Sequence, residues 1–242
     1  MTAPLILDVE QGTPEWLQAR TGLLTGSRAS DAIGVLKSGK ESAARRDYRI
    51  QLVSERLTGR PQEDTFVNAA MQHGTDTEPA ARGAYEAITG QLIRQTGFIQ
   101  RPDVLAGCSL DGHVGSLEGI LELKCPKTAT HLGYLLRPHE LPKRYIPQVT
   151  HNLWVTGATW CDFVSFDDRL PEPMQLFAVR VRAEELGLDA YAEKALTFLK
   201  EVDDELAKLQ EQFADVLVKR ANSRAAKLQE QFADILDTTP VL

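Results

Sequence analysis

The spacing of apolar residues predicts helices in the first third of the chain. Apolar positions recur at helical spacing in three segments, so we expect two short helices within residues 13–33 and single helices over residues 45–57 and 68–89. Gly59 and Gly90 follow the last two segments, at the position where glycine commonly ends a helix.

After residue 90 the hydrophobic pattern changes from helical spacing to alternation, which is typical of strands. Strands are predicted at residues 92–100, 104–110 and 120–125, and we expect these three to pair as an antiparallel meander. A helix and two further strands are then predicted at residues 145–155, 160–166 and 176–181. This order of elements favours an α/β fold with a mixed sheet flanked by helices.

The last quarter of the chain has a third pattern. Apolar residues between 199 and 216 are spaced alternately by three and four, as along a helix that packs against a neighbour. Residues 207–217 recur almost unchanged as 226–236, and Asn222-Ser223 between the copies is predicted to end one helix and cap the next. We therefore predict two domains, residues 1–182 and a helical extension over residues 183–242.

Composition indicates an ordinary globular protein. The chain has 242 residues, 43% of them hydrophobic, and its apolar stretches are far shorter than the roughly 20 residues that span a bilayer. Its three cysteines, Cys108, Cys125 and Cys161, are widely spaced, which argues against a disulfide framework or a zinc or iron–sulfur cluster. We expect an unprocessed cytoplasmic protein without membrane contact.

The formal net charge of -7 hides a local asymmetry. Residues 16–60 contain nine basic residues against four acidic ones, whereas residues 183–242 contain thirteen acidic residues against seven basic ones. Such a split suits a protein that grips nucleic acid with one part, although solvated helix faces at both ends explain the charges equally well.

The strongest chemical signal is Asp111 followed, after a glycine-rich turn, by Glu122-Leu123-Lys124. On a strand Glu122 and Lys124 share one face while Leu123 points into the core, and a hairpin would place Asp111 beside them. Carboxylate oxygens hold Mg²⁺, and an ammonium group can orient or deprotonate a water, so the set suits phosphodiester hydrolysis. A plain hairpin with a solvated ion pair remains the alternative for the motif taken alone.

The motifs around this set resemble one family. Cys108-Ser109-Leu110-Asp111-Gly112 with Leu121-Glu122-Leu123-Lys124-Cys125-Pro126 is similar to the phage lambda exonuclease and YqaJ-type viral recombinase family, a branch of the PD-(D/E)xK nucleases. Four further matches occur in family order: Trp16-x-x-x-Arg20-x-Gly22 with Thr25-Gly26-Ser27, Gly74-x-x-x-Glu78, Tyr145-x-x-Gln148, and Trp154-Val155-Thr156. Leu110 stands where the superfamily expects proline. The resemblance covers residues 11–166 and implies a restriction-endonuclease-like core.

The resemblance also implies a metal centre. Two Mg²⁺ ions, for which Mn²⁺ substitutes, would be held by the carboxylates of Asp111, Glu122 and Glu78 and by the main-chain carbonyl of Leu123. Without the family, Glu78 is an ordinary carboxylate in the first turn of a helix, where the helix dipole favours it.

Further roles follow from the same resemblance. Lys124 would act on the attacking water, and Gln148 would help to position that water or the scissile phosphate. Arg20, Ser27 and Ser109 match residues that bind a terminal 5′ phosphate, for which a guanidinium and two hydroxyls are suitable donors. The plainer alternatives are a surface charge for Arg20, a helix cap for Ser27 and a backbone hydrogen bond for Gln148.

The family implies a function. It implies a 5′-to-3′ exonuclease that degrades one strand of linear double-stranded DNA from 5′-phosphorylated ends and leaves 3′ overhangs for phage or prophage recombination. A homotrimer and a single-strand annealing protein as partner are implied as well. The alternatives are a PD-(D/E)xK endonuclease or repair nuclease, and a non-catalytic subunit that binds DNA ends.

Overall fold

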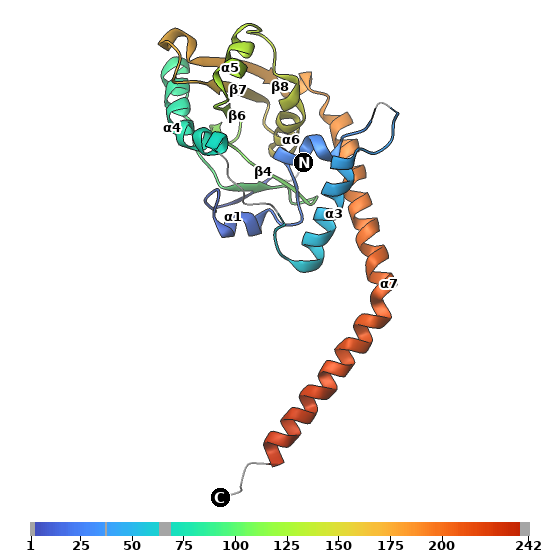
Figure 1. Cartoon of the computed structure of the whole chain (residues 1–242). Coiled ribbons are helices and arrows are strands. Elements are labelled where there is room, and N and C mark those ends of the chain that lie inside the picture. Colours follow the sequence, from blue (N-terminus) through green and yellow to red (C-terminus); the bar gives the residue numbers. More distant parts are fainter. Residues whose placement is uncertain (1–2, 37, 63–68, 238–242) are drawn as a thin grey trace, which may run out of the picture. The chain divides into compact units, whose positions relative to one another are not determined.

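The computed structural model describes residues 3–36, 38–62 and 69–237 (Figure 1). Its internal contacts divide the chain after Val202 into two compact units. The first unit contains both sheets and all predicted site residues, while the described part of the second, residues 203–237, is the continuation of the last helix. Among the helices of these residues, none combines the length and the hydropathy that a membrane crossing requires.

The first sheet combines two strands from the first 25 residues with two strands that follow helix α4 (Ala69–Thr89). It contains β1 (Leu5–Leu7), β2 (Leu24–Thr25), β3 (Phe98–Gln100) and β4 (Ala106–Ser109) in the order β1-β3-β4-β2. β3 pairs antiparallel with both β1 and β4, whereas β2 runs parallel to β4. The sheet is therefore mixed.

The second sheet carries the Glu-Leu-Lys segment. It contains β5 (Gly112–Val114), β6 (Gly119–Lys124), β7 (Trp160–Phe166) and β8 (Leu176–Arg182), paired in sequence order. β6 and β7 are parallel, with Glu122 opposite Phe163, and the other two pairs are antiparallel. The parallel pair requires the long helical connection between residues 125 and 159.

The predicted meander is wrong at one point. β3 and β4 pair as expected, but the chain crosses to the other sheet after β4, so the strands predicted at 104–110 and 120–125 do not pair. Leu110 is buried at the crossing, and a Cβ atom on Gly112 would overlap Ile93. This close approach allows the chain to enter β5, a strand too short to be evident from its pattern.

Helices cover the sheets, as the sequence predicts. The α-helices are α1 (Pro14–Ala19), α2 (Ala29–Ala32), α3 (Ala43–Thr58), α4 (Ala69–Thr89), α5 (Thr128–Leu135), α6 (Ile146–Thr156) and α7 (Leu188–Asp237). Short 3₁₀ turns are η1 (Gly26–Arg28), η2 (Lys143–Tyr145), η3 (Glu172–Met174) and η4 (Ala183–Glu185). The fold class predicted from sequence, mixed α/β, is confirmed, with two sheets in place of one.

Different helices cover the two faces of the second sheet. On one face, α4 contributes Ala81 and Tyr85 to a core cluster that includes Leu123 of β6. On the other face, Tyr134 of α5 makes an edge contact with Phe163 of β7. Because side chains alternate along a strand, Glu122 and Lys124 lie on the face opposite Leu123.

Helix α6 links the two sheets. It contacts β3 and β4 of the first sheet and β7 of the second, and its side chains from Val149 to Thr156 are all buried. Gly157 follows in the left-handed conformation and its amide hydrogen bonds back to Leu153 O, which ends the helix. α6 therefore brings polar groups to the boundary between the sheets.

Helix α7 is continuous, contrary to the predicted break. Asn222 and Ser223 lie within α7, which runs from Leu188 to Asp237. Either residue costs only a fraction of a kcal/mol in a helix interior, and the Ala, Leu, Lys, Gln and Glu around them favour helix. The beginning of α7 packs within the first unit through Tyr191, Phe198 and Val202. A functional boundary at residue 182 stays a prediction.

Candidate active site

Asp111 lies between the two sheets, directly after Leu110 and before β5. Its Oδ2 accepts a hydrogen bond from the main-chain amide of Leu123 at 2.6 Å. This bond attaches the crossing segment to β6 and turns the Asp111 carboxylate toward the face that carries Lys124, whose Nζ lies 3.6 Å from Asp111 Oδ2.

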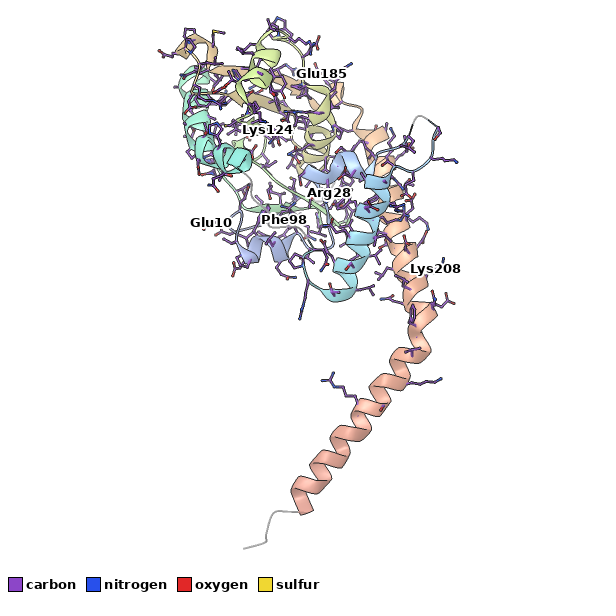
Figure 2. All side chains as sticks on the ribbon, viewed as in Figure 1. Glu10, Arg28, Phe98, Lys124, Glu185 and Lys208 are labelled. Atoms are coloured by element: carbon purple, nitrogen blue, oxygen red, sulfur yellow. The ribbon has the colours of Figure 1, made fainter. Side chains whose placement is uncertain are left out.

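Glu122 and Lys124 complete the centre. Glu122 is buried, its Oε1 forms an ion pair with Lys124 Nζ, and its Oε2 accepts from Asn152 Nδ2 at 3.1 Å. Lys124 Nζ also donates to Leu123 O at 2.9 Å. One ammonium thus contacts oxygens of Asp111, Glu122 and Leu123. Figure 2 marks Lys124 at this centre.

Burial and charge shift the pKa values of the centre. Burial raises the pKa of Glu122, and the Lys124 ammonium opposes this rise while Asp111 adds to it. For Lys124, burial disfavours the charged form, but the charges of Glu122 and Asp111 outweigh it and raise the pKa. Lys124 is therefore a cation in this arrangement, and it orients neighbouring groups through hydrogen bonds.

Glu78 approaches the centre from α4. Burial raises its pKa, and the charge of Asp111 adds to the rise, whereas Arg82 and Lys124 oppose it. Arg82 Nη2 donates to Glu78 Oε1 at 2.6 Å and to the main-chain oxygen of Asp111 at 3.2 Å. Arg82 was not singled out from the sequence, although its position four residues after Glu78 places both on one helix face.

The donor groups fit a hard cation. In residues 3–36, 38–62 and 69–237, no three His, Cys, Asp or Glu side chains are grouped closely enough to hold a metal ion. The oxygens that converge on Lys124 Nζ instead come from two carboxylates and the Leu123 carbonyl. Such oxygens are typical Mg²⁺ ligands. Burial is the largest cause of the raised pKa values of Glu122 and Glu78. A bound cation would lower both pKa values and favour the charged carboxylates.

The three residues assigned to a terminal phosphate form a second group. The Arg20 guanidinium lies 4.1 Å from the Trp16 ring centroid and donates to Ser27 Oγ at 3.4 Å. Trp16 Nε1 in turn donates to Ser109 Oγ at 2.8 Å. Arg20, Ser27 and Ser109 are thus connected through Trp16, and Ser109 is two residues from Asp111.

Helix α3 holds the loop that carries this second group. The main-chain amide of Gly22 donates to Glu55 Oε2 at 2.6 Å, and Arg56 Nε donates to Gly22 O at 2.9 Å. Buried Tyr48 accepts from the Thr25 amide through its hydroxyl at 3.2 Å. These bonds fix the loop on which Arg20 and Ser27 lie.

Gln148 lies near Ser27, beside the second group. Both residues line a cleft of about 300 Å³ together with Gly26, Arg144 and Tyr145. The Tyr145 ring centroid is 5.8 Å from Lys124 Nζ, so this cleft, here called the Gln148 cleft, borders the first group as well.

Asn152 is a functional candidate that sequence reasoning missed. It follows Gln148 by one helical turn, is buried, and holds Glu122 Oε2. Its Oδ1 has no hydrogen-bond partner in the described residues, and a Cβ atom on Gly26 would overlap it. Asn152 therefore contacts both a candidate ligand and the turn that precedes Ser27.

Ion pairs partly neutralise the arginine-rich segment, residues 16–60. In the described residues, Arg28 pairs with Asp31, Arg46 with Asp47, and both Arg45 and Arg49 with Glu41. Glu201 of α7 also pairs with Arg45 at 2.6 Å. At least four of the nine basic residues of this segment thus pair with carboxylates.

Comparison with known proteins supports the resemblance seen in the sequence. A model of the YqaJ-like viral recombinase domain matches residues 15–159. Two structures of LHK-Exo, an alkaline exonuclease from Laribacter hongkongensis, are 38% and, in complex with dAMP, 37% identical to this chain, with TM-scores of 0.74 and 0.75. Each match covers 84% of this chain and 100% of the other.

A more distant structure shares the fold. A phage-related exonuclease from Haemophilus somnus is 17% identical, with a TM-score of 0.60 over 77% of this chain and 96% of its own. Comparison with curated proteins finds no match. The matched domain covers more than half of the chain, including the Asp111, Glu122 and Lys124 centre. By these matches, the chain belongs to the YqaJ-like viral recombinase family.

Proposed function

We propose that this chain is a Mg²⁺-dependent exonuclease that digests one strand of linear double-stranded DNA from 5′-phosphorylated ends. The observation that carries the proposal is the convergence of Asp111, Glu122 and the Leu123 carbonyl on one ammonium. Ser109, two residues before Asp111, is joined to Arg20 through Trp16. Family membership and the similarity to an alkaline exonuclease support DNA as the substrate. The complex of that exonuclease with dAMP supports mononucleotides as the product.

The proposed mechanism assigns a separate task to each group. Bound Mg²⁺ would neutralise the scissile phosphate and lower the pKa of a water molecule. Asp111, Glu122 and the Leu123 carbonyl would hold the first ion, and Glu78 would turn from Arg82 to complete a second site. Lys124 would orient the attacking water by hydrogen bonding.

The other proposed contacts position the DNA. Arg20, Ser27 and Ser109 would bind the terminal 5′ phosphate and so place the first phosphodiester bond at the cleavage centre. Gln148, on the wall of the Gln148 cleft, would contact the scissile phosphate. A homotrimer, a single-strand annealing partner and a role in recombination belong to the same proposal and rest on the family.

An end-labelling assay tests this function. Linear duplex labelled at either the 5′ or the 3′ terminus of one strand is incubated with Mg²⁺, and early release of the 5′ label as mononucleotide is expected. Early release of the 3′ label would contradict the direction. Nicking of a closed circular plasmid would favour an endonuclease, and binding of ends without cleavage in Mg²⁺ or Mn²⁺ would favour a non-catalytic subunit.

A further inference from the structure

A second cleft lies next to the Gln148 cleft. It has a volume of about 590 Å³, and α5, η2 and the loop between them line it, including Tyr134, Arg137, Lys143 and Arg144. Arg144 lines both clefts, so the second, here called the α5–η2 cleft, adjoins the cleft that contains Ser27 and Gln148.

The cations of the α5–η2 cleft differ from those of the arginine-rich segment. Arg137, Lys143 and Arg144 are exposed and form no ion pair within the part of the chain that the structure describes. Glu140 is the one acidic residue among the described residues that line the cleft. The cleft thus presents uncompensated positive charge on a protein whose net charge is -7.

Aromatic contacts hold Arg144 in place without neutralising it. Its guanidinium lies 4.5 Å from the Tyr145 ring centroid and 5.8 Å from that of Tyr134, and it donates to the Tyr145 hydroxyl at 2.6 Å. A guanidinium stacked on rings keeps its charge and its remaining N–H donors. It is therefore prepared to bind an anion where the two clefts meet.

We propose that the α5–η2 cleft binds the sugar–phosphate backbone of DNA beside the cleavage centre. The inference deepens the proposed function and rests on it, because the anion is taken to be the DNA that is cleaved. Uncompensated cations are needed here, since the overall charge repels DNA and phosphate contacts supply much of the binding free energy. On this basis Arg137, Lys143 and Arg144 contact the DNA, and the paired arginines of α3 serve mainly to stabilise the fold.

Salt-dependent DNA binding tests the inference. Binding of a fluorescent 5′-phosphorylated duplex is measured in EDTA, which prevents cleavage, over a series of NaCl concentrations. The double variant Arg137→Gln/Lys143→Gln removes two of the proposed phosphate contacts. The slope of log K against log salt is expected to become shallower by about 1.8, at about 0.9 per contact.

A matched control removes the same charge elsewhere. In Lys40→Gln/Arg46→Gln both residues are exposed and Arg46 already pairs with Asp47, so the slope should stay close to that of the wild type. An unchanged slope in the cleft variant, or an equal change in the control, would overturn the inference.

Cleavage by the wild type, measured separately in Mg²⁺, distinguishes the two proposals. If the wild type cleaves DNA but the salt slope of the cleft variant is unchanged, the proposed DNA site in the α5–η2 cleft is contradicted and the nuclease function is not. Binding that depends on the cleft without any cleavage contradicts the nuclease function and supports the cleft. Thermal unfolding of both double variants checks that each is folded.

Discussion

The two sheets contribute different parts of the candidate site. The first sheet, with the segment from Arg20 to Ser27 that includes β2, carries polar groups suited to a terminal phosphate, including Ser109 at the end of β4. The second sheet carries buried Glu122, which forms an ion pair with the partly buried Lys124. We therefore expect mutations in the first sheet to change recognition of the DNA end, and mutations in the second sheet to change hydrolysis of the phosphodiester bond.

Two features connect the sheets. The chain crosses between them at Leu110 and Asp111, so Ser109 belongs to one sheet while Asp111 bonds to a strand of the other. Helix α6 packs on both and holds Glu122 through Asn152. Variants in each sheet and in α6 can therefore test whether the two parts act independently.

The largest effect is expected in the second sheet. Lys124→Ala removes the group that contacts Asp111, Glu122 and Leu123, so the cleavage rate should fall by about 10²–10⁴-fold, as for loss of a group that acts on the attacking water. Single-turnover cleavage measures the rate, and binding of duplex in EDTA should change little. Lys127→Ala, an exposed neighbour, is the control. A nearly normal rate in Lys124→Ala would remove this lysine from the mechanism.

The next effect concerns the connection between the sheets. Buried His151 of α6 donates from Nε2 to Gly107 O of β4 at 2.9 Å and accepts at Nδ1 from the Tyr191 hydroxyl at 2.7 Å. Burial lowers its pKa to about 4 from the ordinary 6.5. The folded state therefore keeps His151 neutral at pH values where the unfolded chain binds a proton.

The sign of the pH effect follows from this difference. Stability contributed by neutral His151 is fully present above pH 6.5 and is lost as pH falls toward 4, by about 3 kcal/mol in total. Denaturant unfolding of the wild type and of His151→Gln at several pH values measures it. Other groups titrate in both proteins, so the difference between them isolates His151. Parallel pH profiles for the two proteins would contradict the prediction.

Replacing Arg20 should remove recognition of the 5′ phosphate and should lower the cleavage rate less than replacing Lys124 does. If Arg20 binds the terminal phosphate, Arg20→Ala should abolish the preference for 5′-phosphorylated over 5′-hydroxyl duplex, a loss of roughly tenfold or more for charged hydrogen bonds. Cleavage rates on the two substrates give the ratio. Arg46→Ala, which removes an exposed and paired arginine, should keep the wild-type ratio. A wild-type ratio in Arg20→Ala would mean that Arg20 serves the structure, through its contacts with Trp16 and Ser27, and not end recognition.

Sequence periodicity predicted the elements well where a long pattern was present. Helix α3 was predicted over residues 45–57 and spans Ala43–Thr58, because its apolar face and Gly59 define it locally. β5 and α5 were missed, since three and eight residues are too few for a clear pattern. The crossing at Asp111 was read as a turn within one sheet because Asp-Gly is a common hairpin opening. The strand pairing and the packing of Gly112 on Ile93, which depend on tertiary structure, distinguish the two.

The candidate site shows the same limit. Alternation along β6 was sufficient to place Glu122 and Lys124 on one face and Leu123 in the core. Asn152 and Arg82 gave no comparable signal, because an asparagine in a helix and an arginine four residues after a glutamate are common. Their importance depends on the packing of α6 and α4 against β6 and Asp111, which local sequence does not specify.

The smallest effect tests whether Asn152 couples the two parts of the site. Asn152→Ala removes the amide that holds Glu122 Oε2, and loss of such a group that orients a ligand weakens metal binding by about tenfold or more. Gly26→Ala places a methyl group against Asn152 Oδ1 and should displace both Asn152 and the turn before Ser27. Mn²⁺ affinity and the preference for a 5′ phosphate should therefore both fall in Gly26→Ala.

The double variant separates coupling from a general loss of structure. In Gly26→Ala/Asn152→Ala the overlapping oxygen is absent, so Mn²⁺ affinity should be no lower than in Asn152→Ala alone, and the 5′-phosphate preference should partly recover. Gly83→Ala, at an exposed helical glycine with open space around it, and Thr150→Val, a buried neighbour on α6, are the controls. Additive losses in the double variant would mean that Gly26 and Asn152 act independently. In that case the contact between Gly26 and Asn152 of α6 does not couple binding of the 5′ phosphate to binding of the metal ion.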